Sequence, residues 1–214
     1  MSAVKRTVII DAMSIMHEIN TVIDELFEKD DDLPDAVYLP TAAKFFVNLN
    51  ANVRIYITKE EFDNRYQYRN PEILEKLLQI GLLYIEDKST HHYYWDLLTN
   101  AEFHATFLMV NYDYENFPGM YKKTIEKYVI PFMSFKRENW NREIVKKRLR
   151  FQYSIMMDIN LKELSVNPTN VDYQKCISAL VKHPNVSNDQ YVALDDLLEL
   201  IHVKIRIWMF NDDD

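Results

Sequence analysis

Alternating strand and helix patterns run from residue 4 to residue 135, and this alternation most restricts how the chain can fold. Apolar, strand-like runs occupy residues 4–10, 52–58, 82–85, 106–110 and 131–135. Helical patterns separate them, at residues 14–29, 41–50, 71–80, 93–104 and 120–130. Strands that alternate with helices usually pair in parallel and are covered on both faces. The sequence therefore predicts an α/β domain, with a twisted parallel sheet of about five strands flanked by helices.

Two aspartates follow predicted strands at their carboxyl ends. Asp11 comes directly after residues 4–10, and Asp113 comes just after residues 106–110. Ligands of parallel sheets bind beyond these strand ends. Carboxylates there can hold Mg²⁺, which activates water and stabilises charge on a phosphate. Asp11 and Asp113 are therefore candidate metal ligands. The alternatives are that Asp11 caps the following helix, for which Ser14 is another candidate cap, and that Asp113 is a turn residue.

The composition excludes several classes of site. The chain has only two glycines, Gly81 and Gly119, which argues against a glycine-rich phosphate-binding loop. The single cysteine, Cys176, excludes an internal disulfide and a cysteine-based zinc site, and it fits a reducing compartment. The net charge of −8 means that any RNA contact is local, weak or shared with a partner. We expect an intracellular protein, because neither a signal peptide nor a membrane-spanning apolar run is evident.

The composition changes after residue 136, so we divide the chain into a domain at 1–140 and a mainly helical extension at 141–214. Residues 136–150 are strongly basic. This run either follows an RNA backbone or forms a solvated helix face. The residues that we predict to bind RNA are Lys136, Arg137, Arg142, Lys146 and Lys147.

The last predicted helix, residues 188–209, carries a wide apolar face. A face of this kind packs on its own domain or docks a partner protein. We expect part of it to form a protein interface, and the residues predicted to do so are Leu194, Leu197, Leu198, Ile201 and Trp208.

Four segments, taken in order, resemble the NYN domains of the Regnase type, a PIN-like endoribonuclease family. The first is Val8-Ile-Ile-Asp11-Ala-Met-Ser14, and the second runs from Asn70 to Ile85. The third is Met109-Val-Asn-Tyr-Asp113, and the fourth runs from Tyr121 to Phe135. The resemblance covers residues 4–140. It implies a metal-dependent endoribonuclease fold that cuts single-stranded RNA.

The chain departs from the family pattern at the acidic cluster. Where the family has two adjacent carboxylates before its fourth strand, this chain has Tyr94 and Trp95, and Asp96 replaces one of them only if the segment shifts by one residue. A further family acid corresponds to Phe117. The resemblance therefore implies a degenerate site in which Asp11 and Asp113 bind Mg²⁺ or Mn²⁺ weakly or not at all. If the site is active, the catalytic residues are Asp11, Asp113 and Asp96.

The function predicted from these features is that of a catalytically degenerate NYN-type homologue, which serves as a protein-binding subunit in an RNA-decay or small-RNA silencing complex. The alternative is an active Mg²⁺- or Mn²⁺-dependent endoribonuclease. We expect a protein partner, either another NYN-type nuclease or a second copy, with RNA as a further ligand and no membrane. The expected location is the cytoplasm or RNA granules. Tyr93, Tyr94 and Trp95 either stack on bases or pack in the core or on a partner.

Overall fold

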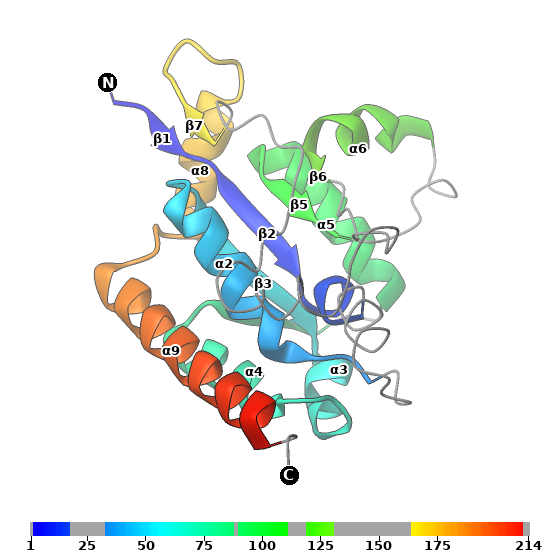
Figure 1. Cartoon of the computed structure of the whole chain (residues 1–214). Helices are drawn as coiled ribbons and strands as arrows, with labels where there is room; N and C mark the ends of the chain where they lie inside the picture. Colours follow the sequence, from blue (N-terminus) through cyan, green and yellow to red (C-terminus); the bar gives the residue numbers. More distant parts are fainter. Residues whose placement is uncertain (1, 18–32, 88–89, 111–118, 131–163, 212–214) are drawn as a thin grey trace, which may run out of the picture.

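The computed structural model describes residues 2–17, 33–87, 90–110, 119–130 and 164–211 (Figure 1). These residues form an α/β fold around a five-stranded parallel sheet, as predicted. The strand order is β4-β3-β2-β5-β6, so the strand that ends in Asp11 lies in the centre. The bounds of the strands are Thr7–Asp11 for β2, Asn52–Thr58 for β3, Leu83–Glu86 for β4, Phe107–Met109 for β5 and Val129–Ile130 for β6.

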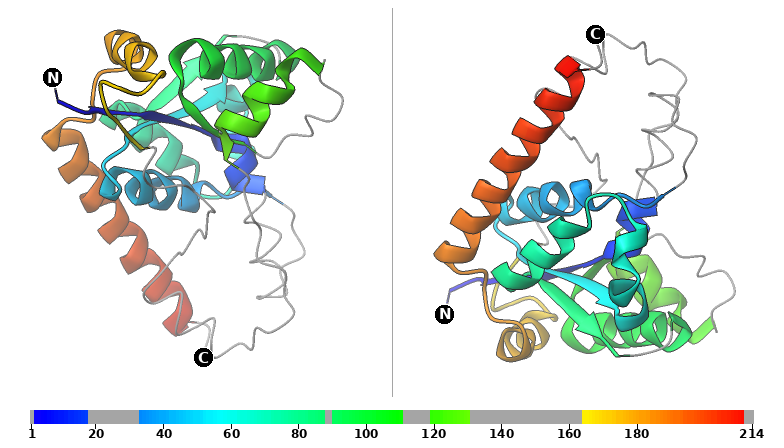
Figure 2. Two further views of the ribbon diagram at one scale, coloured as in Figure 1. Left: turned by 90° about the horizontal axis from the view of Figure 1, so that it is seen from above. Right: turned by 90° about the horizontal axis from the view of Figure 1, so that it is seen from below.

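Helices cover both faces of this sheet (Figure 2). One side carries α2 (Leu39–Asn48), α4 (Pro71–Ile80) and α9 (Asn188–Asn211). The other side carries α5 (Thr90–His104), α6 (Lys122–Tyr128) and α8 (Tyr173–Lys182). Shorter elements connect them, namely α3 (Lys59–Asp63) and the 3-10 turns η1 (Ala36–Tyr38), η2 (Arg65–Gln67) and η4 (Gly119–Tyr121). Both faces of β2 and β3 are buried, as their apolar sequences predict.

Several element boundaries differ from the prediction. The fifth strand begins at Val129, inside the segment predicted as a helix, while residues 131–135 lie outside the described residues. Residues 59–69 show no clear helical period, yet they contain α3 and η2. The predicted stop of α4 is confirmed, because Gly81 adopts the left-handed conformation (φ 78°) that glycine tolerates best.

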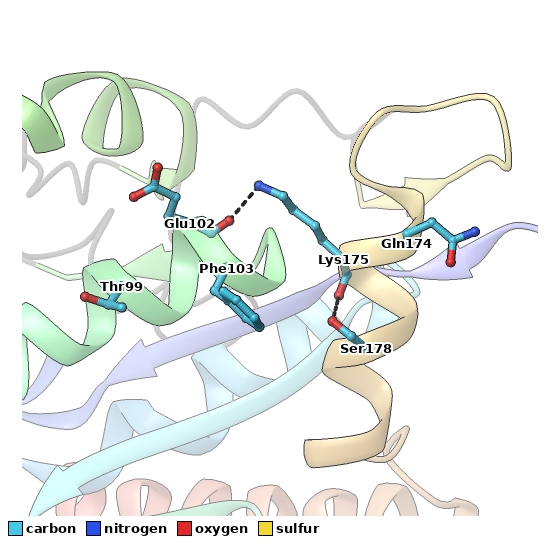
Figure 3. A pocket seen from close by; sticks show the side chains of 6 residues that line it. All are labelled: Thr99, Glu102, Phe103, Gln174, Lys175 and Ser178. Carbon is cyan, nitrogen blue, oxygen red and sulfur yellow. Dashed lines mark hydrogen bonds between the residues drawn. The ribbon is translucent and has the colours of Figure 1, made fainter.

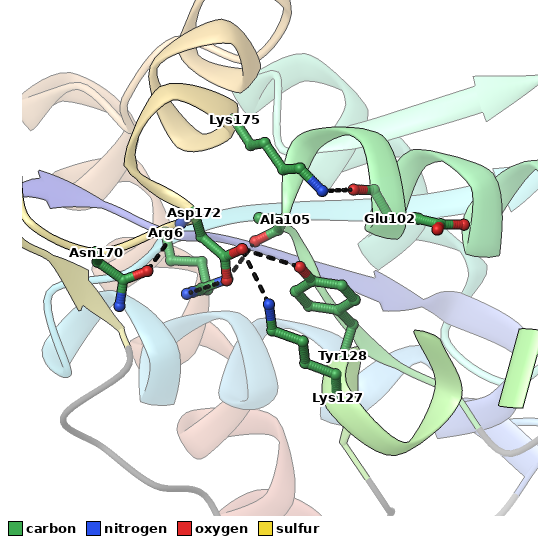
Figure 4. Close-up of polar contacts among 8 residues, drawn as sticks. All are labelled: Arg6, Glu102, Ala105, Lys127, Tyr128, Asn170, Asp172 and Lys175. Carbon is green, nitrogen blue, oxygen red and sulfur yellow. Dashed lines mark hydrogen bonds and ion pairs between the residues drawn. The ribbon is translucent and has the colours of Figure 1, made fainter. Parts of the chain in front are cut away.

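The C-terminal extension contacts the sheet through a buried charged cluster (Figure 4). The strand β7 (Ser165–Val166) pairs antiparallel with β1 (Val4–Lys5), and α8 follows. The Arg6 guanidinium donates to Asp172 Oδ2 at 3.2 and 3.3 Å and to the Ala105 carbonyl at 2.7 Å. Asp172 Oδ1 accepts from Lys127 Nζ at 3.0 Å and from the Tyr128 hydroxyl at 3.1 Å. These contacts join β2, α6 and the start of α8.

The apolar face of α9 packs inside the chain, which corrects the partner surface assigned to it. Leu194, Leu197 and Ile201 are at most 4% exposed, and α9 lies against α2 and α4. Leu198 is partly buried, and the side chain of Trp208 lies outside the described residues. Lys44 of α2 pairs with Asp195 at 2.5 Å, which adds a polar contact beside the apolar one. The burial of Leu194, Leu197 and Ile201 therefore reflects packing of α9 on two helices, whereas the assignments of Leu198 and Trp208 stay predictions.

Among the described residues, none of the helices combines the length and the apolar character needed to cross a bilayer.

Candidate functional site

The candidate site lies at the carboxyl end of β2 and is centred on Asp11, which is 1% exposed. A helix begins at the next residue, and Asp11 acts as its N-cap. Asp11 Oδ2 accepts the Ser14 backbone N–H at 2.9 Å, and it also accepts the Ser14 hydroxyl. The interpretation of Asp11 as a helix cap is therefore confirmed, whereas Ser14, the other candidate cap, is a donor to it.

Two tyrosines of α5 complete the surroundings of the Asp11 carboxylate. The Tyr93 hydroxyl donates to Oδ1 at 2.8 Å, and the Tyr94 hydroxyl donates to Oδ2 at 3.3 Å. The two rings meet edge to face at 5.1 Å, and their exposed fractions are 2% and 7%. Rings buried to this extent cannot stack on bases, so only the core-packing alternative holds for Tyr93 and Tyr94. Trp95 is partly buried and packs edge to face on Tyr121 at 5.1 Å.

A second carboxylate, Glu61, lies near Asp11, and the sequence analysis missed it. Glu61 is in α3, directly after β3, and β3 is the neighbour of β2. Its Oε2 accepts the Thr58 hydroxyl at 2.8 Å and the Thr58 backbone N–H at 3.2 Å, while Thr58 Oγ1 accepts the Glu61 N–H. This reciprocal arrangement is a capping box. Its signature, a threonine followed three residues later by a glutamate, was readable in the sequence.

Burial sets the electrostatics of this site. It raises the pKa of Asp11 above the ordinary value, and the hydrogen bonds from Ser14, Tyr93 and Tyr94 act in the opposite direction. Burial also raises the pKa of Glu61, and the negative charge of Asp11 adds to that effect. The pKa of Tyr93 is raised well above the ordinary value, first by burial and then by Asp11. The Tyr93 hydroxyl therefore keeps its proton and acts as a donor.

This donor set does not fit a metal ion bound by Asp11. Both carboxylate oxygens already accept hydrogen bonds, three at Oδ2 and one at Oδ1, and the side chain is buried. Mg²⁺ needs oxygen atoms that offer lone pairs in near-ideal geometry. Within the described residues, no three side chains among His, Cys, Asp and Glu form a group that could hold a metal.

The structure brings only part of the predicted site together. Asp113 lies outside the described residues, as do Lys136, Arg137, Arg142, Lys146 and Lys147, so their assignments stay predictions. Asp96 lies on α5 and is partly buried. Tyr93 and Tyr94, and not Tyr94 and Trp95, provide the two side chains that meet Asp11.

On the same face of the sheet, a buried histidine contacts the strand residue beside Asp11. Tyr56 pairs in register with Asp11. The hydroxyl oxygen of Tyr56 lies 3.2 Å from Nε2 of His183. Arg54 donates to the carbonyls of Val53 and Pro184 and lies over the Tyr84 ring. Burial, together with the positive charges of Lys182 and Arg54, lowers the pKa of His183 from 6.5 to about 4. His183 is therefore neutral in the folded chain at pH 7.

We expect acid to destabilise the fold through His183. The unfolded chain takes up this proton near pH 6.5, but the folded chain resists it until about pH 4. The stability that His183 contributes is therefore complete above pH 6.5 and is lost as the pH falls toward 4, by about 3 kcal/mol. Urea unfolding at several pH values measures this loss, with His183→Gln as the control without a titrating group. Parallel pH profiles for the two proteins would contradict the expectation.

The comparisons with known proteins do not assign the chain to a family. No protein-family model matches it, and no curated protein matches it. A functional assignment therefore depends on the residues described above.

Proposed function

We propose that this chain is a catalytically degenerate NYN-type ribonuclease homologue that serves as a protein-binding subunit in an RNA-decay or small-RNA silencing complex. The observation that supports the loss of catalysis is that both oxygens of the Asp11 carboxylate accept hydrogen bonds from within the chain. The resemblance to NYN domains supports the type of complex. The net charge of −8 favours a protein partner over RNA as the main ligand.

A nuclease of this type would need Asp11 to act as a metal ligand. A metal-dependent nuclease uses a carboxylate that can exchange water for a cation and bring that cation to a phosphate. Here the carboxylate is 1% exposed and holds the start of a helix in place. To bind a cation, it would have to release Tyr93, Tyr94 and Ser14. Each buried hydroxyl left without a partner would cost about 1–3 kcal/mol.

An active Mg²⁺- or Mn²⁺-dependent endoribonuclease is the second candidate, and the closeness of Glu61 to Asp11 favours it. The charge of Asp11 raises the pKa of Glu61, so the two carboxylates repel each other electrostatically at the same edge of the sheet. Asp113, which lies outside the described residues, would have to complete this pair, because Asp11, Glu61 and Asp96 do not form a group that could hold a metal.

We expect the purified chain to leave single-stranded RNA uncut in Mn²⁺, with the same background as the Asp11→Asn variant. The reason is that Asp11 is committed to internal hydrogen bonds. A gel assay of labelled RNA measures cleavage. The electron paramagnetic resonance signal of free Mn²⁺ measures metal binding independently, and it should be equal for the two proteins. Metal-dependent cleavage by the wild-type chain that Asp11→Asn abolishes would establish the active enzyme instead.

The binding role has its own test. We expect the full chain, used as bait in an affinity purification, to recover proteins of RNA decay or RNA silencing. The Asp11→Asn variant, shown to be folded by circular dichroism, is expected to recover the same set, because the proposed role needs no chemistry at Asp11. Purifications that repeatedly recover no RNA-processing protein would contradict the proposal.

A further inference from the structure

An open groove lies between α5 and α8 (Figure 3), and the α5 residues that line it come later in the helix than Tyr93 and Tyr94. Its volume is about 560 Å³, and its lining combines one aromatic side chain with polar and charged ones. The residues that line it are Thr99, Glu102 and Phe103 of α5 and Gln174, Lys175 and Ser178 of α8. None of the contacts that support Asp11 involves these residues.

One residue that lines the groove is a large, exposed aromatic, and further exposed apolar residues lie on α8. Phe103 is 69% exposed, and its ring lies between the two helices (Figure 3). On α8, Ile177 and Val181 are 36% and 85% exposed and lie one turn apart. The inner side of α8 is buried through Tyr173, Cys176 and Ala179, so these exposed residues belong to its outer side. An exposed aromatic residue beside a hollow and other apolar side chains is typical of an interaction surface.

The two sides of the groove carry opposite charges. Glu102 lies on the α5 side, and its carboxylate points away from α8 (Figure 3). Lys175 and Lys182 lie on the α8 side, where Lys175 Nζ donates to the Glu102 carbonyl at 2.8 Å and Lys182 Nζ lies 3.4 Å from Asn100 Oδ1. The acidic residue at the start of α8, Asp172, is buried and paired with Arg6. The surface therefore holds a negative side and a positive side around one aromatic residue.

We propose that this surface binds a second copy of the chain in a two-fold symmetric dimer. In such a contact the same patch faces itself, so the patch must contain its own complement. This one does, because α5 of one copy can lie over α8 of the other, with Phe103 beside the hollow and Glu102 beside the lysines. The overall charge of −8 makes two copies repel elsewhere, so a locally balanced patch is where they can meet. The inference deepens the proposed binding role and rests on it only for its biological purpose.

Sedimentation equilibrium of the full chain tests the dimer. The wild-type chain should show a monomer–dimer equilibrium. Phe103→Asp should weaken the dimer about 30-fold or more, as expected for a central aromatic contact. Met120→Asp is the matched control, because Met120 is 77% exposed on another element, and it should leave the equilibrium unchanged. A chain that remains monomeric at all accessible concentrations would overturn the proposal. So would a dimer that Phe103→Asp does not weaken.

A charge-reversal experiment tests the symmetry and does not depend on Phe103. Glu102→Lys and Lys182→Glu should each weaken self-association, because each places like charges opposite one another. Mixing the two variants should restore a dimer. In the mixed dimer, position 102 of each copy again faces a residue of opposite charge at position 182 of the other copy. Failure of the mixture to associate better than either variant alone would exclude this contact. The measurements need no RNA, so an active nuclease would refute the proposed function and leave this result unaffected.

Discussion

Replacing Asp172 by alanine is expected to lower the free energy of unfolding by about 3–5 kcal/mol, the cost of removing one partner of a buried ion pair. Arg6 is 2% exposed and would keep its charge without a carboxylate beside it. The Tyr128 hydroxyl would also lose its acceptor. Asp172 is the N-cap residue of α8, but its side chain makes no capping hydrogen bond, so the loss would come from the charged cluster.

The Asp172 carboxylate is held in its charged form by its neighbours. Burial alone would raise its pKa, but Lys127 and Arg6 hold the pKa of Asp172 below the ordinary value. The contacts of Arg6 with the Ala105 carbonyl and with the Phe107 ring, 4.6 Å away, cannot replace this neutralisation. The same cluster joins the C-terminal extension to the sheet, so its loss should loosen α8 as well.

Urea denaturation followed by circular dichroism measures this effect, and Lys127→Met is the matched control. Lys127 pairs with the same carboxylate, but its side chain is 47% exposed. An exposed partner of this kind should contribute less than about 1 kcal/mol. If Asp172→Ala proves no more destabilising than Lys127→Met, the cluster does not stabilise the attachment of the extension.

Replacing Asp11 by alanine is expected to lower the free energy of unfolding by about 3 kcal/mol, through the loss of a helix cap and of the acceptor for buried hydroxyls. The Tyr93 and Tyr94 hydroxyls and the Ser14 hydroxyl all donate to this side chain. Tyr93→Phe is the matched control, because it removes one donor and keeps the cap, and it should cost about 1 kcal/mol.

This prediction also separates the two candidate functions. In an active site, a catalytic carboxylate is commonly kept at the expense of stability, so replacing it leaves stability unchanged or improves it. A structural carboxylate has the opposite effect when it is replaced. An Asp11→Ala variant that unfolds at the same urea concentration as the wild-type chain, or at a higher one, would count against the structural role and favour the nuclease.

The order of strands and helices was largely predictable because it depends on local patterns. The apolar run before Asp11, the proline and glycine at the ends of α4, and the apolar stripe of α9 are each visible within a few residues of sequence. The short α3 was missed because five residues are too few to show a helical period, although its capping box between Thr58 and Glu61 was present. The β6 strand was misplaced because a two-residue strand has almost no pattern of its own.

The sequence by itself determined that a buried parallel strand ends at Asp11 and that a helix follows, because both depend on neighbouring residues, and it offered Asp11 and Ser14 as alternative caps of that helix. Only the tertiary structure decided which groups occupy that carboxylate, because Tyr93 and Tyr94 reach it from a helix on the face of the sheet. It also placed Glu61 nearby, because β3 pairs with β2, and it buried the face of α9 between two helices. Contacts between elements distant in the chain depend on how the layers pack, and local patterns do not contain that information.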